Sequence, residues 1–214
     1  MPDFRTLEFP DAIDEPQEVS PVLGDYLKHI ANKKLRLYKQ YLHTEGEKQG
    51  QSLYSHVMDL VTFVDRLFRA IGLNDIAMRC VLLALTVHDI NKIPIYGQDT
   101  HGRKLKYADA ATEDNIRKEL KRLNADAFFP EWEQYLLDIV YLAHAHQAAS
   151  TATTRLFNQA YIDRTQLKSE LIGPLKFLMQ ATDASDNSHS GNYLDPNEVH
   201  LRDKVLIHIN GVMS

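Results

Sequence analysis

Apolar residues recur every three or four positions along most of the chain, which is the spacing of an amphipathic helix. The first helix is predicted from Ser20 and Pro21, a serine N-cap followed by proline at the first helical position, and the spacing allows it to continue to Leu42. A second helix is predicted from Ser52 to a stop at Gly72. Its apolar positions are Leu53, Val57, Leu60, Val61, Val64, Leu67, Phe68 and Ile71.

The run from Cys80 to Val87 is apolar at every position except Thr86, which predicts a helix buried on all sides. Asn74 or Asp75 is the expected N-cap, and the helix is expected to end in the adjacent pair His88-Asp89. Burying such a pair costs free energy unless its charge is compensated, and a bound cation would compensate it. For an isolated dipeptide a solvated helix end is the better interpretation, so other residues must decide.

The rest of the chain continues the helical pattern. Further helices are predicted from Thr112 through Leu123, from Pro130 to His144 and His146, and from Gln166 to Asp183 with a kink at Gly173-Pro174. Residues 97–110 are expected to form a polar loop, and alternating residues between Val199 and Ile209 suggest a strand. We therefore expect an all-α bundle with a short strand or hairpin near the C-terminus.

Composition narrows the class of protein. A chain of 214 residues with 44% hydrophobic content can form one sizeable core. The formal net charge of −5 argues against an overall basic field for nucleic acid, so a phosphate-bearing substrate needs local cations or a metal. His101, Arg103, Lys104 and Lys106 in the loop form either a solvated cluster, which is the better interpretation, or a rim that faces phosphate. As a rim, Arg103, Lys104 and Lys106 could supply local cations together with Lys118, Lys121 and Arg122 in the next helix. The single cysteine, Cys80, excludes an internal disulfide and any multi-thiolate zinc site.

The sequence shows neither a membrane-spanning apolar segment nor a signal peptide. No apolar stretch approaches 18 residues, and residues 1–21 are acidic and interrupted by proline, unlike a signal peptide. These features predict a soluble cytoplasmic protein with no membrane partner. The expected organisation is an N-terminal arm at 1–20, a helical domain at 21–197, and the start of a following domain or a C-terminal strand at 198–214.

Four ionisable residues stand out against this helical background: His56, the pair His88 and Asp89, and Asp183. A single histidine on an apolar helix face, such as His56, is more often a satisfied core residue than a ligand. Two histidines with two carboxylates, however, form a suitable site for a first-row divalent metal. The sequence therefore predicts a metal centre that joins three separate helices.

The order His, His-Asp, Asp resembles the HD superfamily of metal-dependent phosphohydrolases, and His88-Asp89-Ile90-Asn91-Lys92 is similar to that family's doublet followed by a lysine. The resemblance covers roughly residues 50–185 and implies an HD-domain helical bundle. The segments 51–57 and 87–94 are most similar to the N-terminal HD nuclease domain of the polymerase-like large subunit of type I-D CRISPR effector complexes. That resemblance implies a nuclease acting on single-stranded DNA in antiviral defence, beside other subunits of a CRISPR ribonucleoprotein.

The resemblance also implies roles for individual residues. It assigns His56, His88, Asp89 and Asp183 as metal ligands, with His144 and His146 as further candidates for a second ion. The implied catalytic residues are Asp89, Lys92 and His146, and the implied cofactor is a divalent metal such as Mn, Ni, Co, Fe or Mg. Two-metal family members carry an additional histidine where this chain has Glu113, Asp114 and Asn115, which favours one ion.

Two alternatives remain open from the sequence. An HD-type nucleotide phosphohydrolase or phosphodiesterase would use the same ligands but requires a closed pocket in place of an open groove. A non-catalytic HD scaffold would hold a structural metal or none, and it would have no chemical need for Lys92 and Asp183.

Overall fold

The computed structural model describes residues 19–46, 50–72, 74–144, 164–167, 175, 176, 178 and 179. Over these residues the chain is a bundle of helices, and extended pairing is limited to two isolated bridges, Glu45 with Ser52 and Gln98 with Lys104. The prediction of an all-α bundle is confirmed. The helices are α1 (Pro21–His29), α2 (Arg36–Tyr41), α3 (Leu53–Ile71), α4 (Asp75–Val87), α5 (Pro94–Gly97), α6 (Tyr107–Ala110), α7 (Glu113–Arg122) and α8 (Leu136–Ala143), with the short 3-10 turns η2 (Ile90–Lys92), η3 (Ala125–Ala127) and η4 (Trp132–Tyr135).

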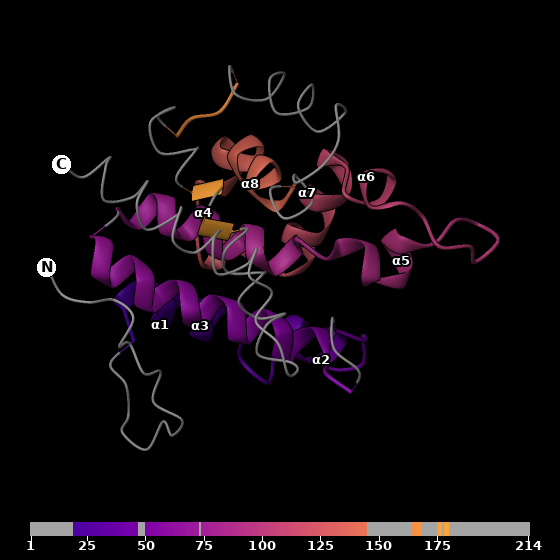
Figure 1. The fold of residues 1–214 in the computed structure, drawn as a ribbon, viewed down its shortest axis with the longest axis horizontal. Helices are drawn as coiled ribbons and strands as arrows, with labels where there is room; N and C mark the ends of the chain where they lie inside the picture. Colours follow the sequence, from indigo (N-terminus) through magenta and orange to yellow (C-terminus); the bar gives the residue numbers. More distant parts are fainter. Residues whose placement is uncertain are drawn as a thin grey trace, which may run out of the picture.

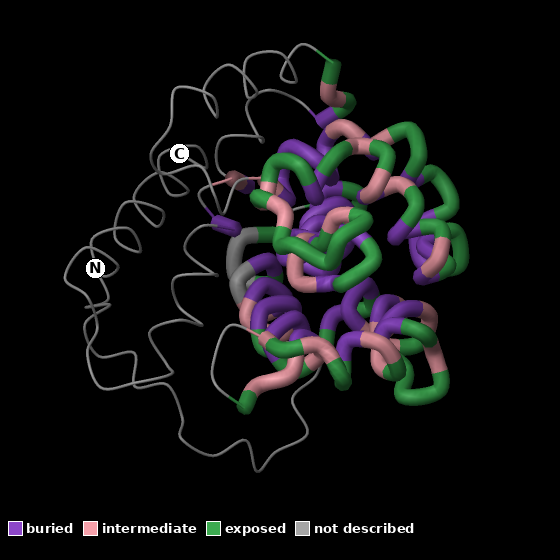
Figure 2. Tube along the Cα trace, turned by 90° about the vertical axis from the view of Figure 1, so that its right-hand side faces the viewer, coloured by how far each residue is buried: buried purple, intermediate pink, exposed green. Residues whose placement is uncertain are grey.

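Helix α4 is the centre of the bundle. It packs against α8 most extensively and also against α1, α3 and α7 (Figure 1). From Ala77 to Val87 every residue except Arg79 is buried, which confirms the buried helix predicted from the apolar run. Buried residues line the inside of the described helices, and exposed residues lie on the outer turns (Figure 2).

Thr86, the one polar residue in that run, joins α4 to α1. Its hydroxyl donates to the carbonyl of Leu82 at 2.7 Å and accepts from the Tyr26 hydroxyl, also at 2.7 Å. Burial raises the pKa of Tyr26 far above its ordinary value, so the phenol remains a donor. Both buried hydroxyls are therefore satisfied within the core.

The predicted helix starts are confirmed by their caps. The side chains of Ser20, Ser52, Asn74 and Thr112 each accept a hydrogen bond from the backbone N–H three residues later. Asn74, and not Asp75, is thus the cap of α4. Helix α3 ends at Gly72, whose φ of 74° is the left-handed conformation typical of a C-terminal glycine.

Two boundaries differ from the predictions. The first helix does not continue to Leu42, because α1 ends at His29 and a turn in which Asn32 accepts from the N–H of Lys34 separates it from α2. The last described long helix begins at Leu136 instead of Pro130. The preceding residues form the 3-10 turn η4, where the Trp132 indole N–H donates to Asp126 at 3.0 Å.

Several predictions lie outside the described residues. The N-terminal arm, the strand at 199–209 and the expected following domain belong to this group. Within the helix predicted from Gln166, residues 175, 176, 178 and 179 are helical, and Leu175, Leu178 and Met179 are buried. Among the described helices, none is both long and apolar enough to cross a membrane.

Candidate metal centre

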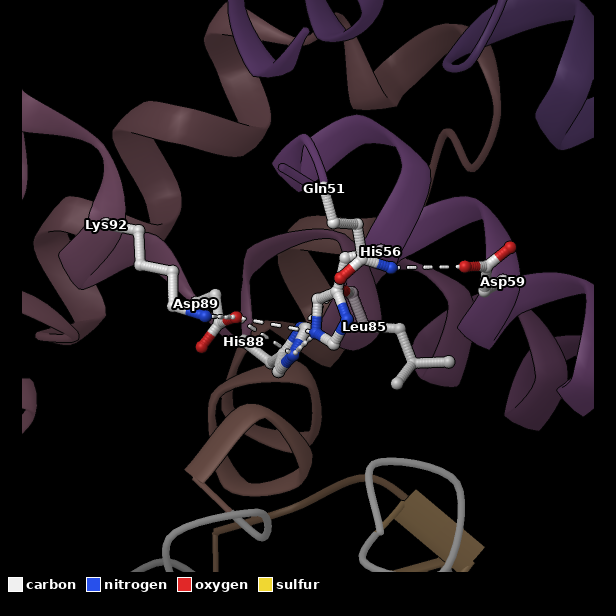
Figure 3. Close-up of polar contacts among 7 residues, drawn as sticks. All are labelled: Gln51, His56, Asp59, Leu85, His88, Asp89 and Lys92. Atoms are coloured by element: carbon white, nitrogen blue, oxygen red, sulfur yellow. Dashed lines mark hydrogen bonds and ion pairs between the residues drawn. The ribbon is translucent and has the colours of Figure 1, made fainter. Parts of the chain in front are cut away.

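Three of the predicted ligands converge on one point in the core (Figure 3). The Nε2 atoms of His56 and His88 lie 3.1 Å apart, and the Oδ2 atom of Asp89 lies 3.5 Å from each of them. The two histidines are 0% and 1% exposed, and Asp89 is 8% exposed. The three side chains thus form a compact triangle of donor atoms closed off from most of the solvent.

The dimensions of this triangle suit a divalent cation. Ligands about 2.1 Å from an ion lie about 3.4 Å apart in a tetrahedral site and about 3.0 Å apart at right angles in an octahedral site. The observed separations of 3.1 and 3.5 Å fall in that range. Two imidazoles and one carboxylate are also a donor set that first-row divalent metals favour. The residues present therefore fit a metal ion.

Secondary structure positions each ligand. The N-cap at Ser52 starts α3 so that His56 falls in its first turn, with its ring directed toward the end of α4. His88 is the C-cap residue of α4, and Asp89 begins the turn η2. The end of one helix and the start of another thereby meet at the candidate centre.

A backbone contact fixes the orientation of His88. Its Nδ1 atom lies 2.7 Å from the carbonyl oxygen of Leu85, and because a carbonyl only accepts, Nδ1 carries the proton. Nε2 of the neutral ring then presents its lone pair to the triangle. A hydrogen bond at the far ring nitrogen is the usual support of a metal-binding histidine.

The electrostatics favour neutral His88 and ionised Asp89. Burial lowers the pKa of His88 below its ordinary value, with the Asp89 carboxylate opposing and His56 reinforcing the shift. The ammonium group of Lys92 lies 2.7 Å from Oδ2 of Asp89, one turn further along the chain. That ion pair compensates the charge of the buried carboxylate.

The two histidines can also satisfy each other by a hydrogen bond. Since Nε2 of His88 accepts, neutral His56 can donate to it from its own Nε2 across the 3.1 Å separation. A metal requires both Nε2 atoms to be unprotonated, so the ring proton of neutral His56 must then be carried by Nδ1. The same triangle therefore has one arrangement with a proton and another with a cation.

His144 makes a different contact. Its Nε2–H donates to the carbonyl of Ala111 at 2.7 Å, and its ring meets the edge of Tyr107 with centroids 5.1 Å apart. If His144 and His146 were ligands of a second ion, this helix would have to end between about Tyr141 and Ala145, and α8 ends at Ala143. The cluster of potential ligands among the described residues nevertheless does not include His144. The further candidates His146 and Asp183 lie outside the described residues.

The first turn of α7 is occupied by local contacts. Glu113 pairs with Arg117 at 2.8 Å, Asp114 pairs with Lys118 at 2.8 Å, and the Asn115 amide donates to the Ala110 carbonyl. The residues at which the sequence resemblance implied a further histidine are thus engaged in contacts within α7 and with the end of α6.

Two supporting features were missed by sequence reasoning. The carbonyl of Leu85 carries no side-chain signal at all. Gly97 is different, because a Cβ added there would stand 1.8 Å from the carbonyl oxygen of Asn91, in the turn that follows Asp89. Its presence in Pro94–Gly97 was visible, but the close approach to Asn91 could not be inferred from one sequence.

Comparisons of the chain with protein-family models, with curated proteins and with solved structures gave no match.

Proposed function

We propose that this protein is a metal-dependent phosphodiesterase that cleaves single-stranded DNA. The observation that carries the proposal is the convergence of His56, His88 and Asp89 at separations suited to one divalent ion. In a six-coordinate site these three ligands, with or without a fourth, leave coordination positions for water and substrate. When bound, such an ion polarises a phosphodiester and lowers the pKa of its water toward about 7.

Lys92 has two roles in this proposal, one toward Asp89 and one toward the substrate. Its ammonium group compensates the charge of the Asp89 carboxylate, at a distance of 2.7 Å. Once that carboxylate is engaged as a ligand, the ammonium group can turn toward the substrate and offset phosphate charge. A side chain that is about one fifth exposed, as Lys92 is, can reach both positions.

The remaining roles depend on residues beyond the described ones. Asp183 is proposed as the fourth ligand and His146 as the group that moves a proton during hydrolysis. The setting in a cytoplasmic CRISPR effector complex, with its other subunits as partners, has the sequence resemblance as its sole support.

A cleavage assay on purified protein tests the proposal. The chain is stripped with chelator, reconstituted with Mn²⁺, Co²⁺, Ni²⁺ or Mg²⁺, and incubated with a labelled single-stranded oligonucleotide. Metal-dependent cleavage that is lost in the His88→Ala, Asp89→Ala double variant is expected. Cleavage by the double variant equal to that of the unchanged chain would refute the assignment.

The same assay is repeated with nucleoside triphosphates and cyclic nucleotides as substrates. Hydrolysis of these small substrates without cleavage of DNA would replace the nuclease with a nucleotide phosphohydrolase. Metal binding without either activity would indicate a scaffold.

A further inference from the structure

The segment between α5 and α6 is an ordered hairpin, although the sequence predicted only a polar loop. The N–H of Leu105 donates to the carbonyl of Gly97 at 2.8 Å, and the N–H of Asp99 donates to that of Arg103 at 2.9 Å. Gly102, with a φ of 75°, allows the turn at the tip. We refer to residues 97–106 as the basic hairpin.

Asp99 holds the tip of the basic hairpin in shape. One carboxylate oxygen accepts from the N–H groups of His101 and Arg103, at 2.8 and 2.9 Å, and the other accepts from Nε of Arg103 at 2.7 Å. These hydrogen bonds, with the backbone N–H of Arg103 first, lower the pKa of Asp99. The loop therefore presents its side chains from a defined backbone.

The base of the basic hairpin rests on the turn η2, which follows Asp89. Gly97 lies so close to the backbone of Asn91 that no other residue fits, and Asn91 stands between Asp89 and Lys92 in η2. At the other end, the hydroxyl of Tyr107 donates to the carbonyl of Ala143 at 3.0 Å. Both α5 and α6 pack on η2, and the hairpin projects from the helices beside them (Figure 1).

The unneutralised cations of this region are concentrated on the basic hairpin. Lys104 and Lys106 are exposed and form no ion pair with any residue that the structure describes. On α7, by contrast, Lys118 pairs with Asp114 and Lys121 pairs with Glu133, each at 2.8 Å. The α7 part of the predicted basic path is thus already compensated by acidic side chains.

An exposed apolar side chain lies in α5, the helix that leads into the basic hairpin. Ile95 in α5 is 65% exposed, the most exposed of the large hydrophobic side chains described. Exposed cations are the groups that bind the phosphates of a single strand of nucleic acid, and an exposed apolar side chain offers its unpaired bases a surface from which water can be displaced.

We propose that the basic hairpin is a strand-holding arm, in which Lys104 and Lys106 contact the phosphates of single-stranded DNA entering the metal centre. The proposal rests on the proposed function for its substrate and extends it with a binding element. Because the arm is fixed to η2, a strand held by it is delivered beside Asp89 and Lys92. Arg103, already paired with Asp99, serves the shape of the arm first.

Charge reversal tests the arm. In the Lys104→Glu, Lys106→Glu variant of the 214-residue chain, the Kd for a fluorescent 20-nucleotide DNA strand should rise at least tenfold near 0.1 M salt. Each phosphate contact to a single strand contributes about −0.7 to the slope of log K against log salt, so the slope should become about 1.4 less steep. Thermal unfolding and Mn²⁺ affinity, measured by calorimetry, should match those of the unchanged chain.

The matched control is Lys33→Glu, Lys34→Glu, which makes the same change of charge at two exposed lysines in the turn between α1 and α2. DNA affinity should fall much less in this control. Equal weakening by both variants would overturn the arm, because it would indicate net charge alone, and so would unchanged binding by the hairpin variant.

The outcome for the arm is separable from that for the proposed function. Hairpin-dependent DNA binding by a chain that shows no metal-dependent cleavage would support the arm and refute the nuclease. Metal-dependent cleavage of DNA by a chain whose DNA binding does not depend on the basic hairpin would support the nuclease and refute the arm.

Discussion

His56, His88 and Asp89 show how far a residue pattern can predict which side chains meet. The doublet at the end of an apolar run and a histidine on a neighbouring apolar face were sufficient to predict that these side chains meet, and they do. The tautomer of His88 could not be predicted, because it depends on the carbonyl of Leu85 at 2.7 Å. The meeting of these three side chains could therefore be predicted from the sequence, whereas their hydrogen-bond partners could not.

Single substitutions should separate ligands from other histidines. His56→Ala should weaken Mn²⁺ binding more than about 100-fold, because losing even an outer partner of a ligand costs 10–100-fold. His144→Ala is the matched control, since the Nε2–H of His144 is used by the Ala111 carbonyl. Calorimetric titration of both variants measures the difference, and equal loss in the two would contradict the single-ion centre.

The free energy of unfolding of the metal-free chain should depend on pH through His88. Burial lowers the pKa of His88 in the folded state, while the unfolded residue titrates near about 6.5. Below that pH the unfolded state binds more protons, so stability should fall as pH falls from about 6.5 toward the folded pKa and should be unaffected above it. Urea unfolding between pH 8 and 5 measures this, and His88→Gln should flatten the curve.

Metal binding should lose affinity over the same acidic range, because protons and the ion compete for the same Nε2 atoms. Unchanged retention of the metal down to about pH 4.5 would point to carboxylate ligands elsewhere.

Among the secondary-structure elements, capping residues predicted where helices begin better than apolar spacing predicted how far they continue. Four helix starts follow from Ser20, Ser52, Asn74 and Thr112, since a capping side chain acts within three residues. The division between α1 and α2 and the late start of α8 depend on packing and turn contacts instead. Such boundaries cannot be read from spacing alone.

The contact between α5 and η2 should be intolerant of any side chain. Gly97→Ala places a methyl group 1.8 Å from the Asn91 carbonyl oxygen, so η2 must shift, at a cost of about 2 kcal/mol or more. Because η2 follows Asp89 directly, Mn²⁺ affinity should fall as well.

Gly24→Ala is the control for Gly97. Its new methyl group meets Val19 at an ordinary 3.9 Å within α1, where alanine is favoured over glycine. Denaturant unfolding should show destabilisation for Gly97→Ala and a neutral or stabilising effect for Gly24→Ala. Equal stability of the two variants would contradict the close approach of Gly97 to the carbonyl of Asn91.

In the molecule as a whole, a bound ion would join helix α3 to the end of helix α4. One ligand comes from α3, and the other two follow α4. An ion that binds only the folded state at 100 times its Kd adds about 2.7 kcal/mol to the free energy of unfolding. For a chain of this size the midpoint should rise by about 5–10 °C.

Thermal unfolding with Mn²⁺ or with chelator measures that shift, and the His88→Ala, Asp89→Ala variant should show none. A similar rise in the double variant would place the stabilising ion elsewhere.

The position of the ion is the most direct test of the account. A crystal of the chain soaked in manganese should give one strong anomalous peak about 2.0–2.3 Å from Nε2 of His56, Nε2 of His88 and Oδ2 of Asp89. Two peaks of equal height bridged by Asp89 would contradict the single-ion centre. Full occupancy at another position, with these three side chains still in contact with one another, would contradict the metal centre itself.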